Sequence, residues 1–470
     1  MSFLYTARSD APAIFLECGR VLSHAELQIE VGTFGDLFSE IGVVFCLCGN
    51  DLPSLRCYLA ALEVGATALL LPGTIQKPQL DNLLAAYAPK YLFHNRSDLV
   101  NYGPTIWSGE SYSLVACSHS QRYETHPDLA LLLATSGSAG SPKLVRLSRR
   151  NLESNADAIN EYLGINVGER AISTLPMHYS FGLSVINSHL RAGASIVLTD
   201  RSLMDSELWR LIRRHGVTSL SGVPYTYDML LKLRIDRLDM PTVKTLTQAG
   251  GKLAAEKIKS VADACAKKDI RFFSMYGQTE ATARISYLPC EYASDKAGSI
   301  GVPIPGCNLW IEDEHGEVIS RPGVVGELVF SGPNVSLGYA ITFHDLLAGD
   351  DNHGVLRTGD LASFDADGYF TIVGRLSRFL KIFGIRVSLD AVEALFADQG
   401  LQAVAFGTDD ALRVCLYGPL TVEPKAISAQ LSASLMISQS AISVVHRSEL
   451  PRLSNGKVDY QTLNNELANK

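Results

Sequence analysis

The chain has 470 residues, of which 47% are hydrophobic and 19% charged, a composition typical of globular proteins and not of disordered ones. Its net charge of −8 argues against a surface for nucleic acid or anionic membrane, and its length suits two or three domains. Nine cysteines without a CxxC pair indicate free thiols, and we recognise neither a signal peptide nor an apolar run of membrane-spanning length. We therefore expect a cytoplasmic protein that binds no nucleic acid and no membrane.

From about residue 41 to residue 288, short apolar runs alternate with amphipathic segments. Strands are predicted at 42–48, 67–71, 129–134, 171–175, 195–199, 245–249 and 270–274, and helices at 52–63, 206–215 and 253–267. This alternation predicts an α/β domain with largely parallel sheets. A polar helix start is expected near 148–151.

The pattern of predicted elements changes after residue 298, from alternating strands and helices to strands alone. Short strands at 309–312, 326–330 and 369–373, separated by glycine turns, predict a β-rich subdomain at about 298–373. Ser388 is expected to cap a helix in a small α+β segment that ends the chain. The expected fold is α/β: a large N-terminal domain over 1–374, a hinge at 375–378 and a small mobile C-terminal domain over 379–470.

The segment from Leu132 to Lys143, LLATSGSAGSPK, is the most informative of the chain. Small residues with free backbone N–H groups and hydroxyls follow an apolar strand, and a lysine adds a positive charge. These features suit a loop that wraps a polyphosphate. No Gly-Lys-Ser/Thr closes the loop, so it is not the P-loop of NTPases. Arg146, Arg149 and Arg150 extend the basic cluster, and we weigh ligand steering and a solvated helix turn equally for them.

Four further motifs follow in order: SMYGQTE at 274–280, LRTGD at 356–360, GR at 374–375 and PRLSNGK at 451–457. Together with the loop they resemble the acyl-adenylate-forming superfamily, which includes acyl-CoA synthetases, peptide-synthetase adenylation domains and luciferases. The resemblance covers about residues 48–460. It implies ATP and Mg²⁺ as cofactors, and a carboxylic acid together with CoA or a separate phosphopantetheinyl carrier protein as partners.

The resemblance also assigns roles to individual residues. The ATP phosphates would be held by Thr135, Ser136, Gly137, Ser138 and Lys143. The nucleoside would be bound by Gly250, Gly251, Tyr276, Gly277, Asp360 and Arg375. Thr279, Glu280 and Lys457 would be catalytic, with Glu280 as the Mg²⁺ ligand and Lys457 between the α-phosphate and the attacking carboxylate. Ser377 would be the hinge, and Gly384 would face the thiol tunnel beside Lys381. The resemblance gives Gly338 and Tyr339 a structural place only.

The substrate pocket is expected from His178, Tyr179, Gly182 and Tyr225, although core packing explains the aromatic residues equally well. Gly182 stands where amino-acid-activating relatives carry an aspartate that grips the α-amino group. A buried ammonium without a partner is costly. We therefore expect an acid without an α-amino group.

The predicted activity is that of an AMP-forming acid–thiol ligase, which releases pyrophosphate and then passes the acyl group to a thiol. Two alternatives stay open: transfer of the acyl group to an amine, and a binding protein that has lost catalysis.

Overall fold

The computed structural model describes residues 10–99, 101–118, 123–134, 143–376, 378–383, 385–397, 401–408, 410–418, 424–435, 437–452, 458–460 and 462–463. The chain forms two compact units, residues 1–309 with 330–356, and residues 310–329 with 357–470. In this division, part of the β-rich segment groups with the C-terminal residues. The domain boundary at 374 and the hinge at 375–378 stay predictions.

The first unit contains a nine-stranded sheet in the order β16-β15-β14-β13-β12-β10-β11-β1-β2. The strands from β14 to β1 in this order are parallel, as predicted. The predicted strand at 171–175 ends at Ile172, because the chain turns and the Thr174 N–H donates to the Ile172 carbonyl. The strands are β1 (Pro12–Leu16), β2 (Val21–Ser23), β10 (Arg170–Ile172), β11 (Ser195–Leu198), β12 (Ser219–Gly222), β13 (Thr245–Gln248), β14 (Arg271–Tyr276), β15 (Ser286–Leu288) and β16 (Val302–Pro303).

An eight-stranded sheet in the order β19-β9-β8-β4-β3-β5-β7-β6 completes the framework of the first unit. Its central strands β8, β4, β3 and β5 are parallel. The strands are β3 (Val43–Cys48), β4 (Thr67–Pro72), β5 (Tyr91–His94), β6 (Thr105–Gly109), β7 (Tyr112–Ala116), β8 (Leu129–Ala134), β9 (Leu144–Ser148) and β19 (Gly338–Ala340).

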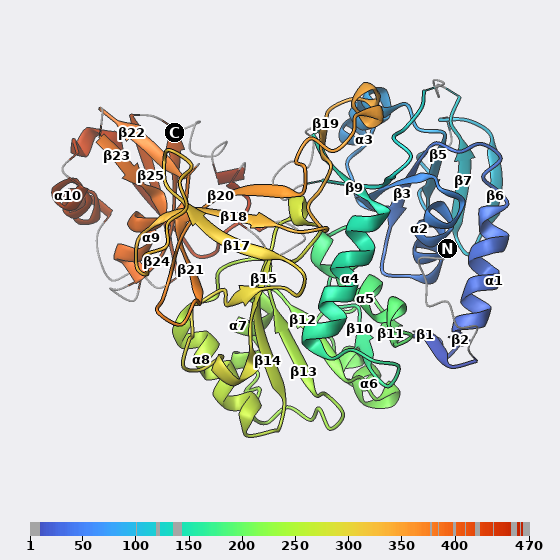
Figure 1. Cartoon of the computed structure of the whole chain (residues 1–470), viewed down its shortest axis with the longest axis horizontal. Helices are drawn as coiled ribbons and strands as arrows, with labels where there is room; N and C mark the ends of the chain where they lie inside the picture. Colours follow the sequence, from blue (N-terminus) through green and yellow to red (C-terminus); the bar gives the residue numbers. More distant parts are fainter. Residues whose placement is uncertain are drawn as a thin grey trace. The chain divides into compact units, whose positions relative to one another are not determined.

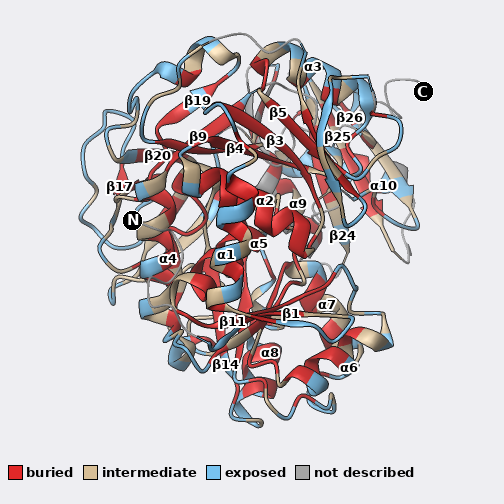
Figure 2. Ribbon diagram, turned by 90° about the vertical axis from the view of Figure 1, so that its right-hand side faces the viewer, coloured by how far each residue is buried: buried red, intermediate tan, exposed pale blue. Residues whose placement is uncertain are grey.

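Helices cover both sheets. Figures 1 and 2 show α4 and α5 between them, and one apolar core joins side chains of both sheets. The helices α6, α7 and α8 pack against the nine-stranded sheet, and α3 packs against the eight-stranded one. Ser148 caps α4 where a helix start was predicted. The helices are α1 (His24–Gly35), α2 (Leu52–Val64), α3 (Lys77–Tyr87), α4 (Arg149–Leu163), α5 (Ser180–Arg191), α6 (Ser206–His215), α7 (Pro224–Lys232) and α8 (Ala255–Ala266).

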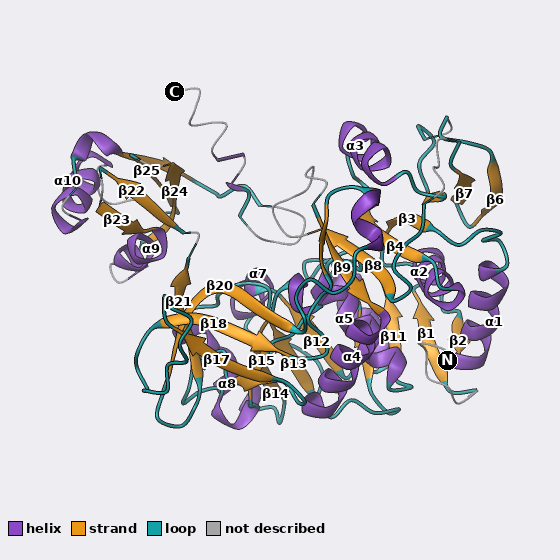
Figure 3. Ribbon diagram, turned by 45° about the horizontal axis from the view of Figure 1, so that its top comes forward, coloured by secondary structure: helices purple, strands orange, loops and turns teal. Residues whose placement is uncertain are grey.

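The second unit is built from short strands and two helices (Figure 3). A four-stranded sheet in the order β17-β18-β20-β21 lies largely in it, followed by the pair β22-β23 and a three-stranded sheet β24-β25-β26. The elements are β17 (Asn308–Glu312), β18 (Gly326–Ser331), β20 (Val355–Phe364), β21 (Phe370–Arg375), β22 (Phe379–Ile382), β23 (Ile385–Ser388), α9 (Leu389–Ala397), β24 (Gln402–Thr408), β25 (Ala411–Tyr417), α10 (Pro424–Leu435) and β26 (Ile442–Arg447). The helix expected after Ser388 is α9.

No helix in the described part of the chain combines the length and apolar character needed to cross a bilayer. All nine cysteines are free thiols, as predicted.

Arg146 has a different role from the ligand steering or solvation that we weighed for the basic cluster. It lies on β9 and is fully buried. Its guanidinium donates to the carbonyl oxygens of Tyr339 (3.0 Å) and Leu337 (2.7 Å), and to the carboxylate of Asp351 (2.5 Å). It therefore holds the segment around β19 onto the sheet. Arg150, in the same cluster, is exposed.

Replacing Arg146 with methionine, which keeps much of the side-chain volume, leaves buried carbonyl oxygens without a donor. We expect the free energy of unfolding to fall by about 2–5 kcal/mol, since each such group costs about 1–3 kcal/mol. Urea denaturation of the whole chain measures this. Arg150→Met is the matched control and should change stability by less than about 0.5 kcal/mol. Equal effects of the two changes would contradict the structural role of Arg146.

Candidate active site

The loop after β14 starts with Tyr276 and Gly277, at the carboxyl end of the parallel strands β13 and β14. Open α/β sheets bind ligands at this edge. Gly277 has no room for a side chain, because a Cβ there would lie 1.9 Å from the carbonyl oxygen of Ala283. The loop therefore folds back on itself and brings its two ends into contact.

Asn334, which is 1% exposed, fixes this loop from the neighbouring segment. Its side-chain amide donates to the carbonyl oxygens of Ala281 (2.9 Å) and Arg284 (2.8 Å). In return, the hydroxyl of Thr282 donates to the Asn334 carbonyl at 2.7 Å. Thr282 has φ of 62°, a left-handed conformation that costs a β-branched residue free energy. These three hydrogen bonds hold the loop in that conformation.

Three side chains form a chain of contacts beside the loop. The ammonium of Lys143 lies 3.7 Å from the ring centre of Tyr339, and the Tyr339 hydroxyl donates to a carboxylate oxygen of Glu280 at 2.8 Å. Burial, and then the negative charge of Glu280, raise the pKa of Tyr339 far above its ordinary value. The hydroxyl thus stays protonated and orients the carboxylate. The sequence predicted roles for Lys143 and Glu280, and the structure brings both into contact with one tyrosine, Lys143 with its ring and Glu280 with its hydroxyl.

Glu280 suits a magnesium ion. Its carboxylate is partly exposed, and its second oxygen accepts no hydrogen bond from a described residue. Mg²⁺ prefers oxygen ligands and is commonly held by one or two carboxylates together with phosphates and water. No group of three or more His, Cys, Asp or Glu side chains with metal-binding geometry occurs among the described residues.

Other predicted residues surround the same loop. Thr279 begins a 3₁₀ turn (Thr279–Ala281), and its hydroxyl lies 3.3 Å from that of Ser180 at the start of α5. The amide of Gln278 donates to the Tyr276 hydroxyl at 3.1 Å. Gly250 and Gly251 follow β13, where the Gln248 side chain donates to the Gly251 carbonyl at 2.9 Å. The neighbouring strand ends thus gather four predicted residues of the first unit: Gly250, Gly251, Tyr276 and Thr279.

Asp360 and Arg375 belong to the second unit and form an ion pair there. They face each other across the antiparallel strands β20 and β21, with Arg375 Nε 2.5 Å from Asp360 Oδ1. The Asp360 side chain is 4% exposed and that of Arg375 is 50% exposed. The guanidinium of Arg375 therefore holds the buried Asp360 carboxylate in one orientation. A carboxylate that accepts hydrogen bonds from a ribose needs such a fixed orientation.

Seven predicted residues lie outside the described part of the chain: Thr135, Ser136, Gly137, Ser138, Ser377, Gly384 and Lys457. Their roles stay predictions.

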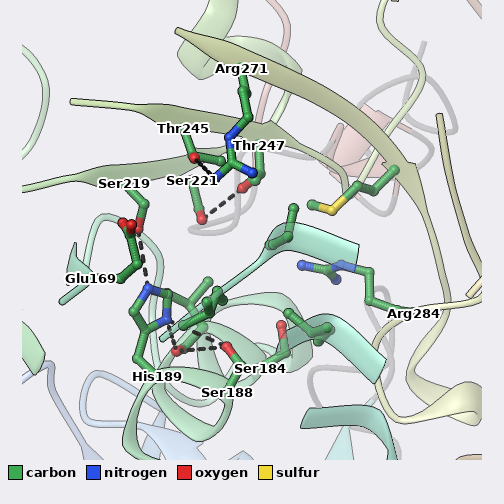
Figure 4. Close-up of a pocket in the computed structure, with 15 residues that line it drawn as sticks. Glu169, Ser184, Ser188, His189, Ser219, Ser221, Thr245, Thr247, Arg271 and Arg284 are labelled. Carbon is green, nitrogen blue, oxygen red and sulfur yellow. Dashed lines mark hydrogen bonds between the residues drawn. The ribbon is translucent and has the colours of Figure 1, made fainter. Parts of the chain in front are cut away.

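A small cavity lies between α4, α5 and the strands β12 to β14 (Figure 4). Its volume is about 20 Å³, where one water needs roughly 10–15 Å³. The surface of the cavity is mostly apolar, with hydroxyl and charged groups among its lining residues: Ile159, Leu163, Ile165, Glu169, Ser184, Val185, Ser188, His189, Ser219, Ser221, Thr245, Thr247, Arg271, Met275 and Arg284. The cavity was not predicted, because these are isolated residues on separate elements.

The residues predicted for the pocket lie around this cavity and do not line it. The Tyr179 hydroxyl packs against Gly250, where a Cβ would lie 2.4 Å from it. His178 lies beside the Cys48 thiol, and Tyr225 is 47% exposed on α7. Gly182 packs against backbone, since a Cβ there would lie 2.3 Å from the Pro176 carbonyl oxygen. An aspartate at 182 would therefore disturb packing before it changed the charge of the pocket.

The sequence analysis missed Asn334, Tyr339 and Arg284 as site residues. The sequence contained a signal for Tyr339, because this residue belongs to a motif of the family. We had given that motif a structural place only. Arg284 follows the SMYGQTE motif by four positions. Only the structure shows that it is buried.

A sequence profile of the family described as "AMP-binding enzyme" matches residues 5–340. A 2-succinylbenzoate–CoA ligase of Bacillus cereus is 31% identical over 378 residues, which cover 78% of this chain and 76% of the ligase. A PKS-NRPS hybrid synthetase of Aspergillus candidus is 26% identical over 439 residues, which are 86% of this chain but only 17% of that protein. The solved structure of O-succinylbenzoate coenzyme A synthetase from Bacillus subtilis with AMP has a TM-score of 0.77 and 23% identity, and covers 97% of this chain and 95% of that one. The predicted fold is thereby confirmed.

The burial of His189 predicts how the stability of the protein depends on pH. It is 3% exposed, and burial lowers the pKa of its imidazole from 6.5 to about 4. Between these values the unfolded chain binds more protons than the folded one, so stability falls as the pH falls from 6.5 to 4. The expected loss between pH 7 and pH 4 is about 3 kcal/mol, measured by urea denaturation.

His189→Gln should remove this part of the pH dependence. The exposed His315, replaced in the same way, is the control and should leave the pH profile of the parent unchanged. A profile of His189→Gln that is parallel to that of the parent would contradict a neutral buried imidazole.

Proposed function

The chain belongs to the family of AMP-binding enzymes, and from this premise we propose that it is an AMP-forming ligase that joins a carboxylic acid without an α-amino group to a thiol. The observation that carries the proposal is the contact chain of Lys143, Tyr339 and Glu280 at the carboxyl edge of the sheet. It holds a cation on the ring and a carboxylate suited to Mg²⁺ on the hydroxyl of one tyrosine, and the cation directly follows in sequence the loop expected to hold phosphates. ATP is the co-substrate and Mg²⁺ the metal.

The first half-reaction brings two anions together. A carboxylate oxygen of the acid attacks the α-phosphorus of ATP, the bond from that phosphorus to the bridging oxygen breaks, and pyrophosphate leaves with the electron pair. In the second half-reaction the thiolate sulfur attacks the acyl carbon, the bond from that carbon to AMP breaks, and the thiol proton goes to solvent. No proton needs to be removed from the acid at pH 7, since a carboxyl group is already ionised. Positioning and charge compensation are therefore the main tasks of the protein.

The described residues suit these tasks. Lys143 would place positive charge near the phosphates, and the resemblance gives the same task to Lys457, which lies outside the described residues. Mg²⁺ held by Glu280 would compensate the charge of the phosphate oxygens. Thr279, next to Ser180, would donate a hydrogen bond to the α-phosphate. Tyr276 would stack on the adenine, and Asp360, held by Arg375, would accept hydrogen bonds from the ribose.

The acceptor is CoA or a separate phosphopantetheinyl carrier protein. The 2-succinylbenzoate–CoA ligase covers most of the chain at 31% identity, which supports CoA, whereas the hybrid synthetase supports a carrier. The nine free thiols support a cytoplasmic location, because a reducing compartment keeps cysteines unpaired. Acid-dependent exchange of pyrophosphate into ATP, over a panel of acids, followed by thiol addition, tests the function. If no acid in the panel supports exchange, the proposal fails.

Glu280→Gln replaces a carboxylate with a weaker ligand for a hard cation, and should sharply raise the Mg²⁺ concentration needed for half-maximal exchange. Tyr339→Phe keeps the ring under Lys143 and removes only the hydrogen bond to Glu280. It should raise the same concentration by about 2- to 10-fold, the value of one hydrogen bond. The partly exposed Tyr292, replaced by Phe, serves as control. Superimposable Mg²⁺ titrations of Glu280→Gln and the parent would show that another group holds the metal.

Lys457→Ala should slow adenylate formation by about 10²–10³-fold, the usual cost of one preorganised charge contact. Thioester formation from supplied acyl-AMP should be largely retained. Lys381→Ala is the reciprocal control, because the resemblance places Lys381 at the second half-reaction. It should spare pyrophosphate exchange and slow thioester formation. If Lys457→Ala slows both half-reactions equally, the two lysines do not serve separate steps.

A further inference from the structure

Arg284 is a buried cation without a counter-ion. It is 3% exposed, and its Nε has no hydrogen-bond partner among the described residues. One Nη donates to the carbonyl oxygen of Ala283 at 3.2 Å, and the guanidinium lies 4.1 Å from the ring centre of Phe181. The titratable groups that face it are the phenols of Tyr162, which shares a hydrogen bond with the guanidinium, and of Tyr179, with no carboxylate of the described residues among them. Buried charges in proteins are normally paired, so this one calls for an anion.

The guanidinium points into the cavity of Figure 4. Glu169 lies across the cavity, beside Ser219 and His189, and accepts a hydrogen bond from Thr218 at 2.5 Å. His189 is neutral at pH 7, because burial holds its pKa near 4. Arg271 also lines the cavity, but it is an exposed residue, and it donates to the Thr245 hydroxyl at 2.9 Å. Arg284 is therefore the buried cation that faces the cavity.

Arg284 is also next to the loop that carries the proposed chemistry. A Cβ on Gly277 would lie 2.9 Å from the Arg284 Cα, and Asn334 binds the Arg284 carbonyl. The backbone of Arg284 therefore belongs to the loop beside which the acid would react, and its side chain extends from that loop into the cavity. Resting on the proposed function, we propose that the substrate is a short dicarboxylic acid, whose second carboxylate binds Arg284 while the first is activated.

The chemistry of the cavity favours this class over others. The planar fork of a guanidinium matches a carboxylate with two parallel hydrogen bonds. The volume of about 20 Å³ suits a small polar group, and neither a long alkyl chain nor an aromatic ring. A neutral apolar end would leave the buried Arg284 without an anion, and an ammonium would face a buried cation of like charge.

The test compares acids of equal carbon number in pyrophosphate exchange: succinate with butyrate, and glutarate with valerate. The monoamide of succinate, which keeps the shape and loses the charge, is the third member of the first set. The parent protein should prefer the dicarboxylate by about 10²-fold or more in kcat/KM, since a site built for a polar group strongly rejects analogues that lack it. Equal use of mono- and dicarboxylates would overturn the proposal.

Arg284→Met should lower kcat/KM for the dicarboxylate by about 10²–10³-fold, mainly through KM, and leave the monocarboxylate unchanged or improved. The kcat/KM of Arg284→Lys for the dicarboxylate should lie between those of the parent and of Arg284→Met, because lysine keeps the positive charge and lacks the planar pair of donors. The exposed Arg210, replaced by Met, is the matched control and should behave as the parent. If Arg284→Met slows both acids equally, or if Arg271→Met alone removes the preference, the assignment to Arg284 is wrong.

Melting temperatures separate this inference from the proposed function. Succinate alone should raise the melting temperature of the parent and of Arg210→Met, but not that of Arg284→Met. Without ligand, Arg284→Met should melt at the same temperature as the parent or higher, because an unpaired buried charge is removed. A melting temperature well below that of the parent would show that Arg284 is structural. Exchange with monocarboxylates only would overturn the inference and leave the ligase activity standing, whereas binding of succinate without exchange of any acid would overturn the ligase activity.

Discussion

The site depends on three hydrogen bonds between Asn334 and the loop 276–284. They join two segments that are about fifty residues apart in sequence, and satisfy carbonyl groups that would otherwise be buried without a donor. Because Asn334 lies four residues before Gly338, the same contacts bring Tyr339 against Glu280. The loop also contains Thr282 in a strained backbone conformation, and favourable interactions elsewhere in the structure must compensate for its free-energy cost. The position of Glu280, which we propose as the metal ligand, and that of the Arg284 backbone both depend on this one attachment.

Residues of the same chemical type have different tasks according to their burial. Arg146 is fully buried and directs its donors to carbonyl groups of its own unit. Arg375 is half-exposed and orients a buried carboxylate. Arg284 is buried with an unsatisfied nitrogen, which is the arrangement expected of a residue that binds an anionic ligand. Net charge says nothing of this difference, since a chain of charge −8 still places its cations where anions must bind.

The alternation of apolar runs predicted most of the parallel strands, because a strand buried on both faces reads as a continuous apolar segment. Val43–Cys48 and Leu129–Ala134 are of this kind, and both are buried throughout or almost so. The motifs predicted Lys143, Glu280 and Asp360 as site residues, and the structure adds their partners. Asn334 and Arg284 could not be found in this way. Asn334 is distinguished by its hydrogen bonds to the loop and Arg284 by its burial with an unpaired nitrogen, and both properties depend on contacts between residues that are distant in sequence. The cavity could not be predicted for the same reason, because its serines and threonines are single residues on separate strands and helices.

The sequence argument against an α-amino group rested on a missing aspartate at 182, yet Gly182 faces the carbonyl groups of Leu175 and Pro176 and has no room for any side chain. The charge of the cavity is independent of that position. The buried guanidinium of Arg284 disfavours an ammonium group in the cavity by like-charge repulsion and by the cost of desolvating it. Discrimination against acids with a positively charged far end would then be a property of Arg284. Because Arg284 is on the same loop as Glu280, selection of the substrate and its activation would share one attachment to Asn334.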